Sequence, residues 1–362
     1  MFGSVYKNCR VLVTGQTGFK GSYLAFWLQK LGAKVCGIGL EMDYSPTHLE
    51  LLNLDIESHI IDIRDAQLLE KVFNDFKPEI VFHLAAQPLV RLSYLKPVET
   101  FSTNLMGTIN VLEACRNCKT VKAIVAISSD KCYENIEQLK GYTEDDPMGG
   151  SDPYSASKGA MELILQSYRR SFFNPALYGK GVDCLLASGR AGNVIGGGDW
   201  AQDRLVCDMM KAASKGEKSF IRNPHSVRPF QHVLEPLSGY LQLGQKLLEG
   251  KSEFSSGWNF GPKEDKVVTV LAAANAMAAV WDKVKFDVAT TQNGPHEAKL
   301  LTLDCTKAYQ KMQWEGVWSS IEAFKYTTLW YRKYYEENVI ATANDLDEYV
   351  AWAIKKGLSW TK

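Results

Sequence analysis

The sequence predicts an α/β fold in which a doubly wound parallel sheet is followed by a smaller α/β lobe. Three observations support this prediction. Short β-rich runs alternate with helical patterns through the first half of the chain, and a glycine-rich loop directly follows the first of those runs. The alternation then stops after about Ser188. Regular alternation of strand and helix indicates parallel strands joined by right-handed crossovers.

Six strands of this sheet are predicted from short runs rich in β-branched residues. They lie at residues 10–14, 34–39, 59–62, 79–83, 121–128 and 182–187. Helices are predicted between them, because apolar residues recur there at helical spacing. These helices span residues 19–31, 68–76, 98–115 and about 154–168.

The second half of the chain predicts the smaller lobe. Helical patterns occur at about 234–248, 268–283 and 321–336, with a short strand candidate at 286–288. We expect residues 1–187, with a returning segment at about 229–256, to form the sheet domain. Residues 188–228 and 257–362 are then expected to form most of the lobe.

Composition limits the classes of partner. The chain has 362 residues, of which 46% are hydrophobic, so it can bury a large core. Its 41 basic and 41 acidic residues give no reason to expect nucleic acid or an anionic membrane as partner. The longest apolar runs have the length of a strand and not of a membrane span. A local phosphate site needs only a few positioned donors and stays compatible with this balance.

The eight cysteines are scattered, apart from Cys115 and Cys118. No second pair and no histidine cluster accompanies these two, so we expect no metal site. Cys36 and Cys184 fall in strand-like apolar runs and are expected to be buried thiols. Scattered thiols without a secretory signal indicate a reducing cytoplasm.

The glycine-rich loop at residues 14–21 predicts a nucleotide site. Glycines three residues apart allow a tight turn and the close approach of the backbone to a phosphate. Free N–H groups and the dipole of the following helix favour a pyrophosphate there. A doubly wound sheet with such a loop is a Rossmann fold. The residues of this turn expected to contact a cofactor are Gly15, Thr17, Gly18, Phe19 and Gly21.

Residues at the ends of the later strands extend the predicted cofactor site, because ligands lie at the carboxyl edge of such a sheet. Glu41 or Asp43, after the second strand, would accept from a ribose 2′-hydroxyl and repel a 2′-phosphate, which favours NAD over NADP. Both positions also suit a solvated loop. The strand-end residues expected at the cofactor are Asp62, Ile63, Leu84, Ala85 and Ala86.

Tyr154 and Lys158 lie four residues apart on a predicted helix and therefore project from one face. An ammonium close to a phenol favours the phenolate and lowers the tyrosine pKa from its usual value of about 10. Such a tyrosine exchanges a proton with a substrate hydroxyl at neutral pH. The same spacing also occurs on ordinary solvated helices. Here Ser129, Asp130 and Lys131 end the fifth strand, which favours a catalytic site.

Taken together, these residues resemble the nucleotide-sugar 4,6-dehydratases of the extended short-chain dehydrogenase/reductase family, and most of all those acting on CDP-glucose. The resemblance covers nearly the whole chain, although residues 41–43 are acidic where the family is neutral and Pro-rich. The matching segments are residues 14–22, 85–93, 128–135, 152–158, 190–200, 228–236, 258–261 and 296–298.

The resemblance implies an NAD-dependent, redox-neutral loss of water from CDP-D-glucose. That reaction lies on a route to dideoxysugars of surface polysaccharides such as the lipopolysaccharide O-antigen. The resemblance also implies a homodimer or homotetramer that pairs through the helices at 98–115 and 154–168.

The resemblance assigns catalytic roles to five residues. Tyr154 takes the proton of the sugar 4-hydroxyl, Ser129 hydrogen-bonds the 4-oxygen, and Lys158 lowers the pKa of Tyr154 and holds the nicotinamide ribose. Asp130 serves as the acid for the 6-hydroxyl, if burial raises its pKa. Lys131 is either the base at C5 or a group that merely orients Asp130 or water.

Substrate contacts are expected from the lobe and from the edge of the sheet. A guanidinium fork matches phosphate oxygens, which favours arginines at the diphosphate, unless they form ion pairs between the two parts. The expected substrate ligands are Gln87, Asn193, Arg204, Arg228 and His296, and Asn104 is expected beside the cofactor.

Two other functions fit parts of the pattern. A 4-epimerase, or a dehydratase of another nucleotide sugar, shares Tyr154 and Lys158, but an epimerase does not need Asp130 and Lys131. A non-catalytic dinucleotide-binding module often lacks the tyrosine or the lysine, and both are present here.

Overall fold

The computed structural model describes residues 1–138, 140–201, 204–262, 268–289 and 301–362. Within them, seven strands form one parallel sheet in the order β11-β6-β5-β4-β1-β2-β3. The predicted doubly wound sheet is thus confirmed. Its strands are β1 (Arg10–Thr14), β2 (Lys34–Gly39), β3 (Glu57–Ile60), β4 (Ile80–His83), β5 (Ala123–Ile127), β6 (Leu185–Ala191) and β11 (Gly257–Phe260).

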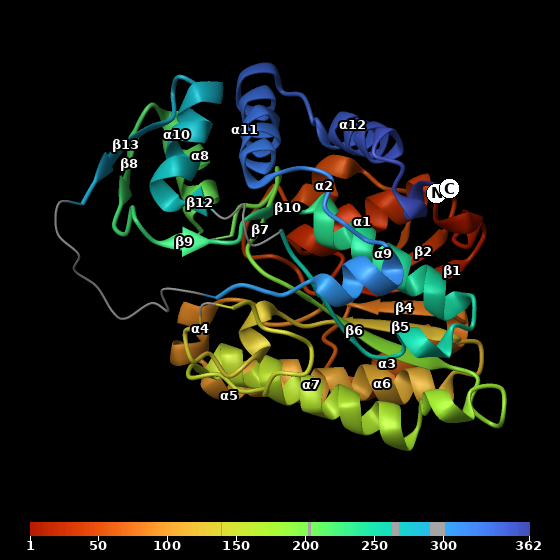
Figure 1. The fold of residues 1–362 in the computed structure, drawn as a ribbon. Coiled ribbons are helices and arrows are strands. Elements are labelled where there is room, and N and C mark those ends of the chain that lie inside the picture. Colours follow the sequence, from red (N-terminus) through yellow and green to blue (C-terminus); the bar gives the residue numbers. More distant parts are fainter. Residues whose placement is uncertain (139, 202–203, 263–267, 290–300) are drawn as a thin grey trace.

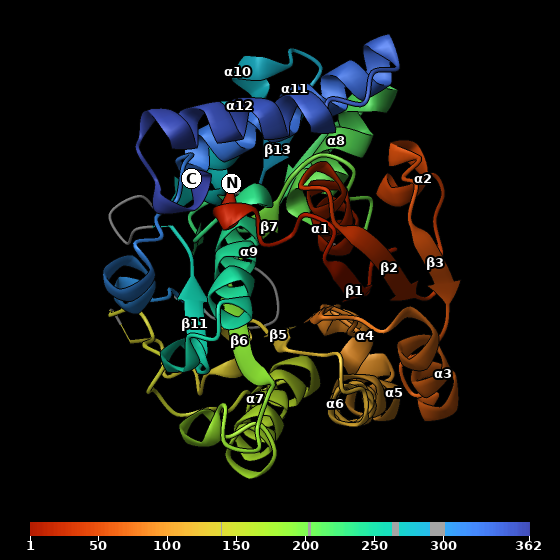
Figure 2. The ribbon, with the colours of Figure 1, turned by 90° about the vertical axis from the view of Figure 1, so that its right-hand side faces the viewer.

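Helices cover both faces of this sheet (Figures 1 and 2). On one face lie α3 (Ala66–Phe76), α6 (Thr108–Asn117) and α7 (Pro153–Ser171). On the other lie α1 (Phe19–Lys30) and α9 (Leu234–Leu248). Because successive side chains of a strand point to opposite faces, Val11 and Val13 enter one hydrophobic core while Leu12 enters the other. A near-continuous apolar run such as β1 is the consequence of burial on both faces.

The remaining helices frame the edge where strands end. The helix predicted at 98–115 is a continuous helical run made of α5 (Pro97–Phe101), a π-helical segment (Ser102–Gly107) and α6. Shorter helices α2 (His48–Leu52) and α4 (Val90–Leu95) follow β2 and β4. Near the chain ends, α12 (Thr342–Lys355) lies close to the N-terminus (Figure 1). None of the helices described is both long and apolar enough to cross a membrane.

The smaller lobe packs around its own core, which includes Met210, Trp281 and Trp330. It holds two-stranded sheets and three helices beside the carboxyl edge of the main sheet (Figure 1). Its helices are α8 (Leu205–Lys215), α10 (Val270–Val280) and α11 (Ser320–Glu337). The short strands pair as β7 (Val194–Ile195) with β10 (Gln231–His232), β8 (Lys218–Ile221) with β13 (Lys285–Val288), and β9 (Val227–Arg228) with β12 (Val268–Thr269).

Two predicted strand positions are corrected by the structure. The sixth strand lies at Leu185–Ala191, where we expected 182–187, and so it continues past the domain boundary expected at residue 187. Strand β11 joins the sheet from residues 257–362, which we expected to lie mainly in the lobe. The sequence pattern breaks at Ser188 because polar side chains begin there. These side chains are nevertheless buried, since Ser188 and Arg190 both hydrogen-bond Glu162. The third strand lies at Glu57–Ile60, two residues before the predicted 59–62. The rest of the domain division stays a prediction.

Candidate active site

The glycine-rich turn after β1 forms a backbone cradle. Gly15 has a φ of +79°, and a Cβ there would lie 2.8 Å from the amide nitrogen of Ala85. A Cβ at Gly21 would collide with the carbonyl of Gly15. Gly18 caps α1 without any side-chain hydrogen bond, so no capping side chain uses the amide groups of the first turn of the helix. This turn therefore has the room and the donors that a dinucleotide diphosphate needs.

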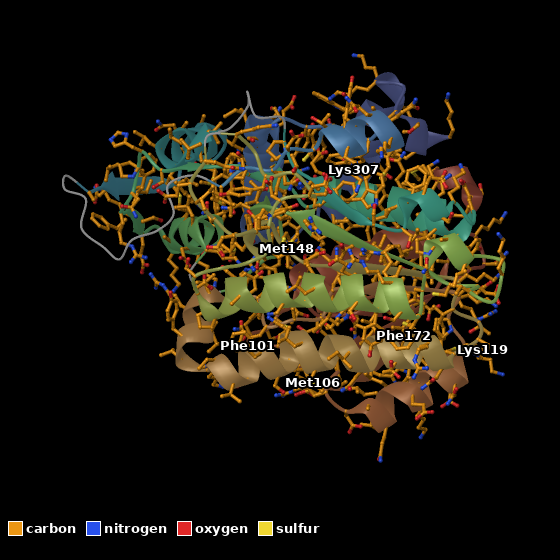
Figure 3. The ribbon with its side chains drawn as sticks, turned by 60° about the horizontal axis from the view of Figure 1, so that its bottom comes forward. Phe101, Met106, Lys119, Met148, Phe172 and Lys307 are labelled. Carbon is orange, nitrogen blue, oxygen red and sulfur yellow. The ribbon has the colours of Figure 1, made fainter. Side chains whose placement is uncertain are left out.

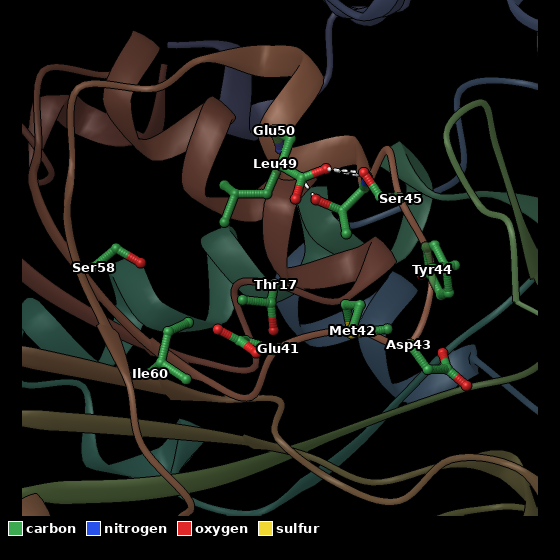
Figure 4. A pocket seen from close by; sticks show the side chains of 11 residues that line it. Thr17, Glu41, Met42, Asp43, Tyr44, Ser45, Leu49, Glu50, Ser58 and Ile60 are labelled. Carbon is green, nitrogen blue, oxygen red and sulfur yellow. Dashed lines mark hydrogen bonds between the residues drawn. The ribbon is translucent and has the colours of Figure 1, made fainter.

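A cavity of about 600 Å³ lies beside this turn, against the ends of β2 and β3 (Figure 4). Thr17 lines it from the glycine turn, and Glu41 and Asp43 line it from the segment after β2. Asp62 and Ile63 do not line it. The carboxylate of Asp62 pairs with Arg64 at 2.5 Å, which lowers its pKa, and Ile63 is buried against Gly107. The cavity has the position expected for the adenosine half of a dinucleotide.

The end of β4 is tied to its surroundings by buried polar side chains. His83 bonds Thr14 at 2.7 Å and Thr108 at 2.9 Å. The amide of Asn104 bonds the backbone of Gln87 and, at 2.8 Å, the hydroxyl of Ser157 on α7. Leu84 and Ala85 lie beside Gly15 at this strand end. The contacts of Leu84, Ala85 and Ala86 with a cofactor stay a prediction.

Gln87 is used within the chain. Its amide nitrogen donates to Leu89 and Thr100, and its oxygen accepts from Leu89 at 2.5 Å. The side chain shapes the turn after β4, and its role as a substrate ligand stays a prediction.

The predicted catalytic residues converge where β5 ends. Ser129 caps a single 3₁₀ turn at Asp130–Cys132, accepting from the amide of Lys131 at 3.2 Å and donating to Asp130 Oδ1 at 2.9 Å. Tyr154, the second residue of α7, lies near Ser129, which favours the phenolate of Tyr154 and so acts to lower its pKa. The structure thus brings a phenol, a hydroxyl and a carboxyl into one buried group.

The expected lowering of the Tyr154 pKa by Lys158 stays a prediction. Burial raises the pKa of Tyr154 to about 12, although Ser129 and Arg204 both favour the phenolate. Lys158 lies deeper, where its ammonium donates to Ile127 O at 3.4 Å, and burial lowers its pKa to about 8. Burial is thus the largest effect on the pKa of both groups.

Asp130 has the property that its predicted role needs. It is 4% exposed, and burial raises its pKa even though Lys131, Ser129 and Lys20 favour the carboxylate. A Cβ at Gly192 would lie 3.2 Å from Asp130 Oδ2, so the glycine after β6 leaves room beside this oxygen. The expectation that burial raises this pKa is confirmed.

The substrate side of the site is described only in part. Arg204, at the start of α8, pairs with the buried Asp199 at 2.8 Å while its side chain stays 35% exposed. Its charge reaches Tyr154. Asn193 follows β6, and its carbonyl accepts from Gln231 at 2.9 Å. The side chain of Arg228 and all of His296 lie outside the described residues.

Sequence reasoning missed three charged residues of the site. Lys20 on α1 lies near Asp130, Lys158 and Arg204, and burial together with Arg204 lowers its pKa to about 8. Its place inside the glycine motif was a signal that could have been used. Glu162 and Arg190 form a buried pair behind the catalytic turn. For that pair, the signal was an arginine, Arg190, near the end of the otherwise apolar strand β6.

Within the described residues, one group of potential metal ligands occurs outside this site. Cys36, Glu57 and His59 place their ligand atoms within 4.8 Å of one another, and His59 already pairs with Glu57 at 2.7 Å. The group lies between β2 and β3, away from the catalytic turn, and we assign no role to it.

A tyrosine and a lysine four apart on the helix after β5, with a serine at the end of that strand and a glycine turn after β1, define a dehydrogenase-type site on a Rossmann sheet. Residues 12–325 match the family model described as GDP-mannose 4,6 dehydratase. The chain belongs to this nucleotide-sugar dehydratase family.

A CDP-glucose 4,6-dehydratase from Salmonella typhimurium is 48% identical over 351 residues, which are 96% of this chain and 97% of that protein. A dTDP-D-glucose 4,6-dehydratase from Dictyostelium discoideum is 32% identical over 46% of this chain and 42% of its own length. The chain is therefore similar to the first of these relatives over nearly the full length of both proteins.

Two solved structures illustrate the likeness of the fold. A Thermus thermophilus UDP-glucose 4-epimerase in complex with NAD has a TM-score of 0.75 at 25% identity and covers 89% of this chain and 99% of its own. A dTDP-glucose 4,6-dehydratase from Streptomyces venezuelae with NAD bound has a TM-score of 0.72 at 22% identity, over 90% of this chain and 97% of its own. The predicted fold class is confirmed.

Proposed function

We propose that the chain is an NAD-dependent CDP-D-glucose 4,6-dehydratase that forms CDP-4-dehydro-6-deoxy-D-glucose and water. The observation that carries this proposal is the full-length 48% identity to a CDP-glucose 4,6-dehydratase. The meeting of Ser129, Asp130 and Tyr154 in one buried group supports it. An oxidation site alone would need the tyrosine and serine, whereas loss of water also needs an acid and a base.

The proposed cofactor fits the backbone cradle. The glycine turn would hold the NAD diphosphate at the N-terminus of α1, and Glu41 or Asp43 would face the adenosine ribose in the cavity of Figure 4. When bound, NAD supplies an acceptor for the hydride of sugar C4 and returns that hydride to C6. Its positive ring would also favour the phenolate of Tyr154, against the effect of burial.

Tyr154 and Ser129 are the proposed oxidation half of the site. Tyr154 accepts the proton of the 4-hydroxyl, and Ser129 donates a hydrogen bond to the resulting 4-oxygen. Lys158 holds the nicotinamide ribose from behind, where it is 3% exposed. The 4-keto group then makes the C5 proton acidic.

Asp130 and Lys131 are the proposed elimination half. Lys131, acting when neutral, removes the C5 proton, and Asp130 protonates the departing 6-hydroxyl. The raised pKa of Asp130 supports this, because an acid at neutral pH must hold its proton. The alternative is that Lys131 only orients Asp130 or water. Arg204, Arg228 and Asn193 are proposed at the diphosphate and sugar, and His296 at the nucleotide.

We also propose that the protein works as a homodimer or homotetramer in the cytoplasm, on a route to dideoxysugars of surface polysaccharides. Exposed apolar side chains gather on the helices of one sheet face, and Leu95, Val98, Met106 and Leu163 are each at least half exposed. In Figure 3, α6 and α7 run side by side across this face, with Met106 at its edge. Seven buried thiols that form no disulfide support a reducing compartment.

Mass spectrometry of the purified protein incubated with NAD and one nucleotide sugar at a time tests the activity. CDP-glucose is expected to lose one water. Conversion of dTDP-glucose or GDP-mannose in place of CDP-glucose would move the substrate assignment. An isomer of unchanged mass would instead identify a 4-epimerase, the activity of several similar solved structures.

A further inference from the structure

A buried ion pair lies directly behind the catalytic turn. Glu162 on α7 is 4% exposed and Arg190 on β6 is 5% exposed. The guanidinium grips the carboxylate with two parallel hydrogen bonds, of 2.9 Å to Oε1 and 2.8 Å to Oε2. A bidentate pair of this kind fixes orientation as well as charge.

The same carboxylate accepts hydrogen bonds from two serines, one directly after β5 and one on β6. Ser128 donates to Oε1 at 2.5 Å and Ser188 donates to Oε2 at 2.9 Å. Ser128 directly precedes Ser129, so the bond sets where the catalytic turn begins. Arg190 also donates to the hydroxyl of Tyr133, at 2.6 Å, just after that turn. The ion pair therefore anchors the turn on both sides.

Helix α7 packs tightly against the catalytic turn. A Cβ at Gly159 would lie 2.6 Å from the carbonyl oxygen of Gly149 and 3.0 Å from that of Cys132. The backbone of the catalytic turn thus rests directly on α7 between Lys158 and Glu162. A shift of the carboxylate would be transmitted to the turn.

Glu162 also lies one helical turn from Lys158, whose ammonium contacts only Ile127 O and Met161 Sδ among the described residues. The titratable groups that act on Lys158 or feel its charge are Cys132 on the catalytic turn, Lys20 on α1, His83 on β4 and Glu162 itself. Glu162 is the carboxylate among them. Burial lowers the pKa of Lys158 to about 8, and Glu162 opposes that fall.

We propose that Glu162, held by Arg190, is a positioning residue that fixes the turn bearing Ser129, Asp130 and Lys131 and keeps Lys158 charged. This role rests on the proposed dehydratase function. Glu162 would then help to position both the residues of the oxidation half and those of the elimination half.

The test compares the pH dependence of turnover in three variants of the full-length protein with NAD and CDP-glucose. Glu162→Gln keeps the shape of the side chain but leaves the charge of Arg190 without a counter-charge. The alkaline limb of the pH profile of turnover is therefore expected to move about one pH unit lower, the scale for loss of a neighbouring opposite charge. The double variant Glu162→Gln/Arg190→Gln restores local neutrality and is expected to move the limb back. Ser128→Ala keeps the charge, and it is expected to lower turnover about 3- to 10-fold with the limb unmoved, the scale of one lost hydrogen bond.

A limb that stays in place in Glu162→Gln would overturn the role at Lys158, and wild-type turnover in Ser128→Ala would overturn the role at the turn. A lowered thermal midpoint with an unmoved limb would reduce Glu162 to a structural residue. If Glu162→Gln does not fold, Ser128→Ala decides the role at the turn, since slowed turnover at an unchanged thermal midpoint supports that role and wild-type turnover refutes it. A wild-type protein that dehydrates no nucleotide sugar would refute the proposed function instead.

Discussion

The two sides of the site differ in how firmly the chain holds them. On the sheet side, Tyr154 and Ser129 are each 8% exposed and Lys158 is 3% exposed, and Ser129 donates to Asp130 while Lys158 donates to Ile127 at the end of β5. On the lobe side, Arg204 is 35% exposed, and its ion pair among the described residues is with Asp199. Chemistry needs atoms placed to within fractions of an ångström, whereas a charged substrate can be gripped by side chains that still move. Substitutions on the sheet side should therefore lower kcat, and those on the lobe side should raise KM.

Tyr154→Phe is expected to have the largest effect. Loss of the phenol removes the proton acceptor for the 4-hydroxyl, so kcat should fall about 10²- to 10⁴-fold, the usual scale for a positioned acid–base group. Steady-state kinetics with CDP-glucose measure it, and Tyr168→Phe on the same helix is the matched control. A Tyr154→Phe variant that turns over like the control would place the acid–base group elsewhere.

Lys131→Ala separates the two halves of the sheet side. If Lys131 is the C5 base, turnover should fall about 10²-fold while C4 oxidation persists and exchange of the C5 proton with solvent stops. Exchange is followed by mass spectrometry in D₂O, with Lys122→Ala at the start of β5 as control. Normal exchange of the C5 proton in Lys131→Ala would show that Lys131 is not the C5 base and only orients Asp130 or water.

Arg204→Gln tests the lobe side. Loss of a charge-assisted hydrogen bond to the diphosphate should raise KM for CDP-glucose about 10-fold and change kcat less than about 3-fold. The thermal midpoint is measured alongside, because Asp199 loses its partner. Arg332→Gln, which breaks an exposed ion pair with Glu336, is the control. A fall in kcat at constant KM would assign Arg204 to the chemistry and contradict the division between the two sides.

Asp345→Asn is expected to have the smallest effect and none on turnover. Burial raises the pKa of this α12 carboxyl to about 8, and Oδ2 has no hydrogen-bond partner among the described residues. Between about pH 4 and 8 the folded protein keeps a proton that the unfolded chain has lost, so stability falls as the pH rises through this window.

Because asparagine does not titrate, the thermal midpoint of Asp345→Asn should exceed that of the wild type by about 2–4 °C at pH 8, and the difference should vanish near pH 4. Exposed Asp75→Asn is the control. A difference independent of pH would contradict the raised pKa of Asp345.

The sequence sufficed for features whose cause is local. The apolar run at Arg10–Thr14 and the helical spacing of Tyr154 and Lys158 are read from neighbours in the chain, and both predictions hold in the structure. The extent of β6 escaped prediction because its polar end is satisfied by Glu162, on another element. The pKa of Tyr154 escaped for a similar reason, since burial in the assembled site decides its direction.

The lobe side was harder to predict for a different reason. An arginine in the sequence can bind phosphate or pair with a carboxylate, and only the fold brings Asp199 to Arg204. Likewise, the glycine motif pointed to Lys20 but not to its neighbours, because only the fold brings this lysine near Asp130 and Lys158.

The central claim is that one buried site both oxidises C4 and eliminates water across C5 and C6. The most direct measurement is mass spectrometry of the product formed from CDP-glucose and NAD in D₂O. The account predicts a product lighter by one water that carries one solvent deuterium, at C5, with the C4 hydrogen of the substrate recovered at C6. A product of unchanged mass, or one that carries a solvent deuterium at C6 in place of the C4 hydrogen, would contradict it.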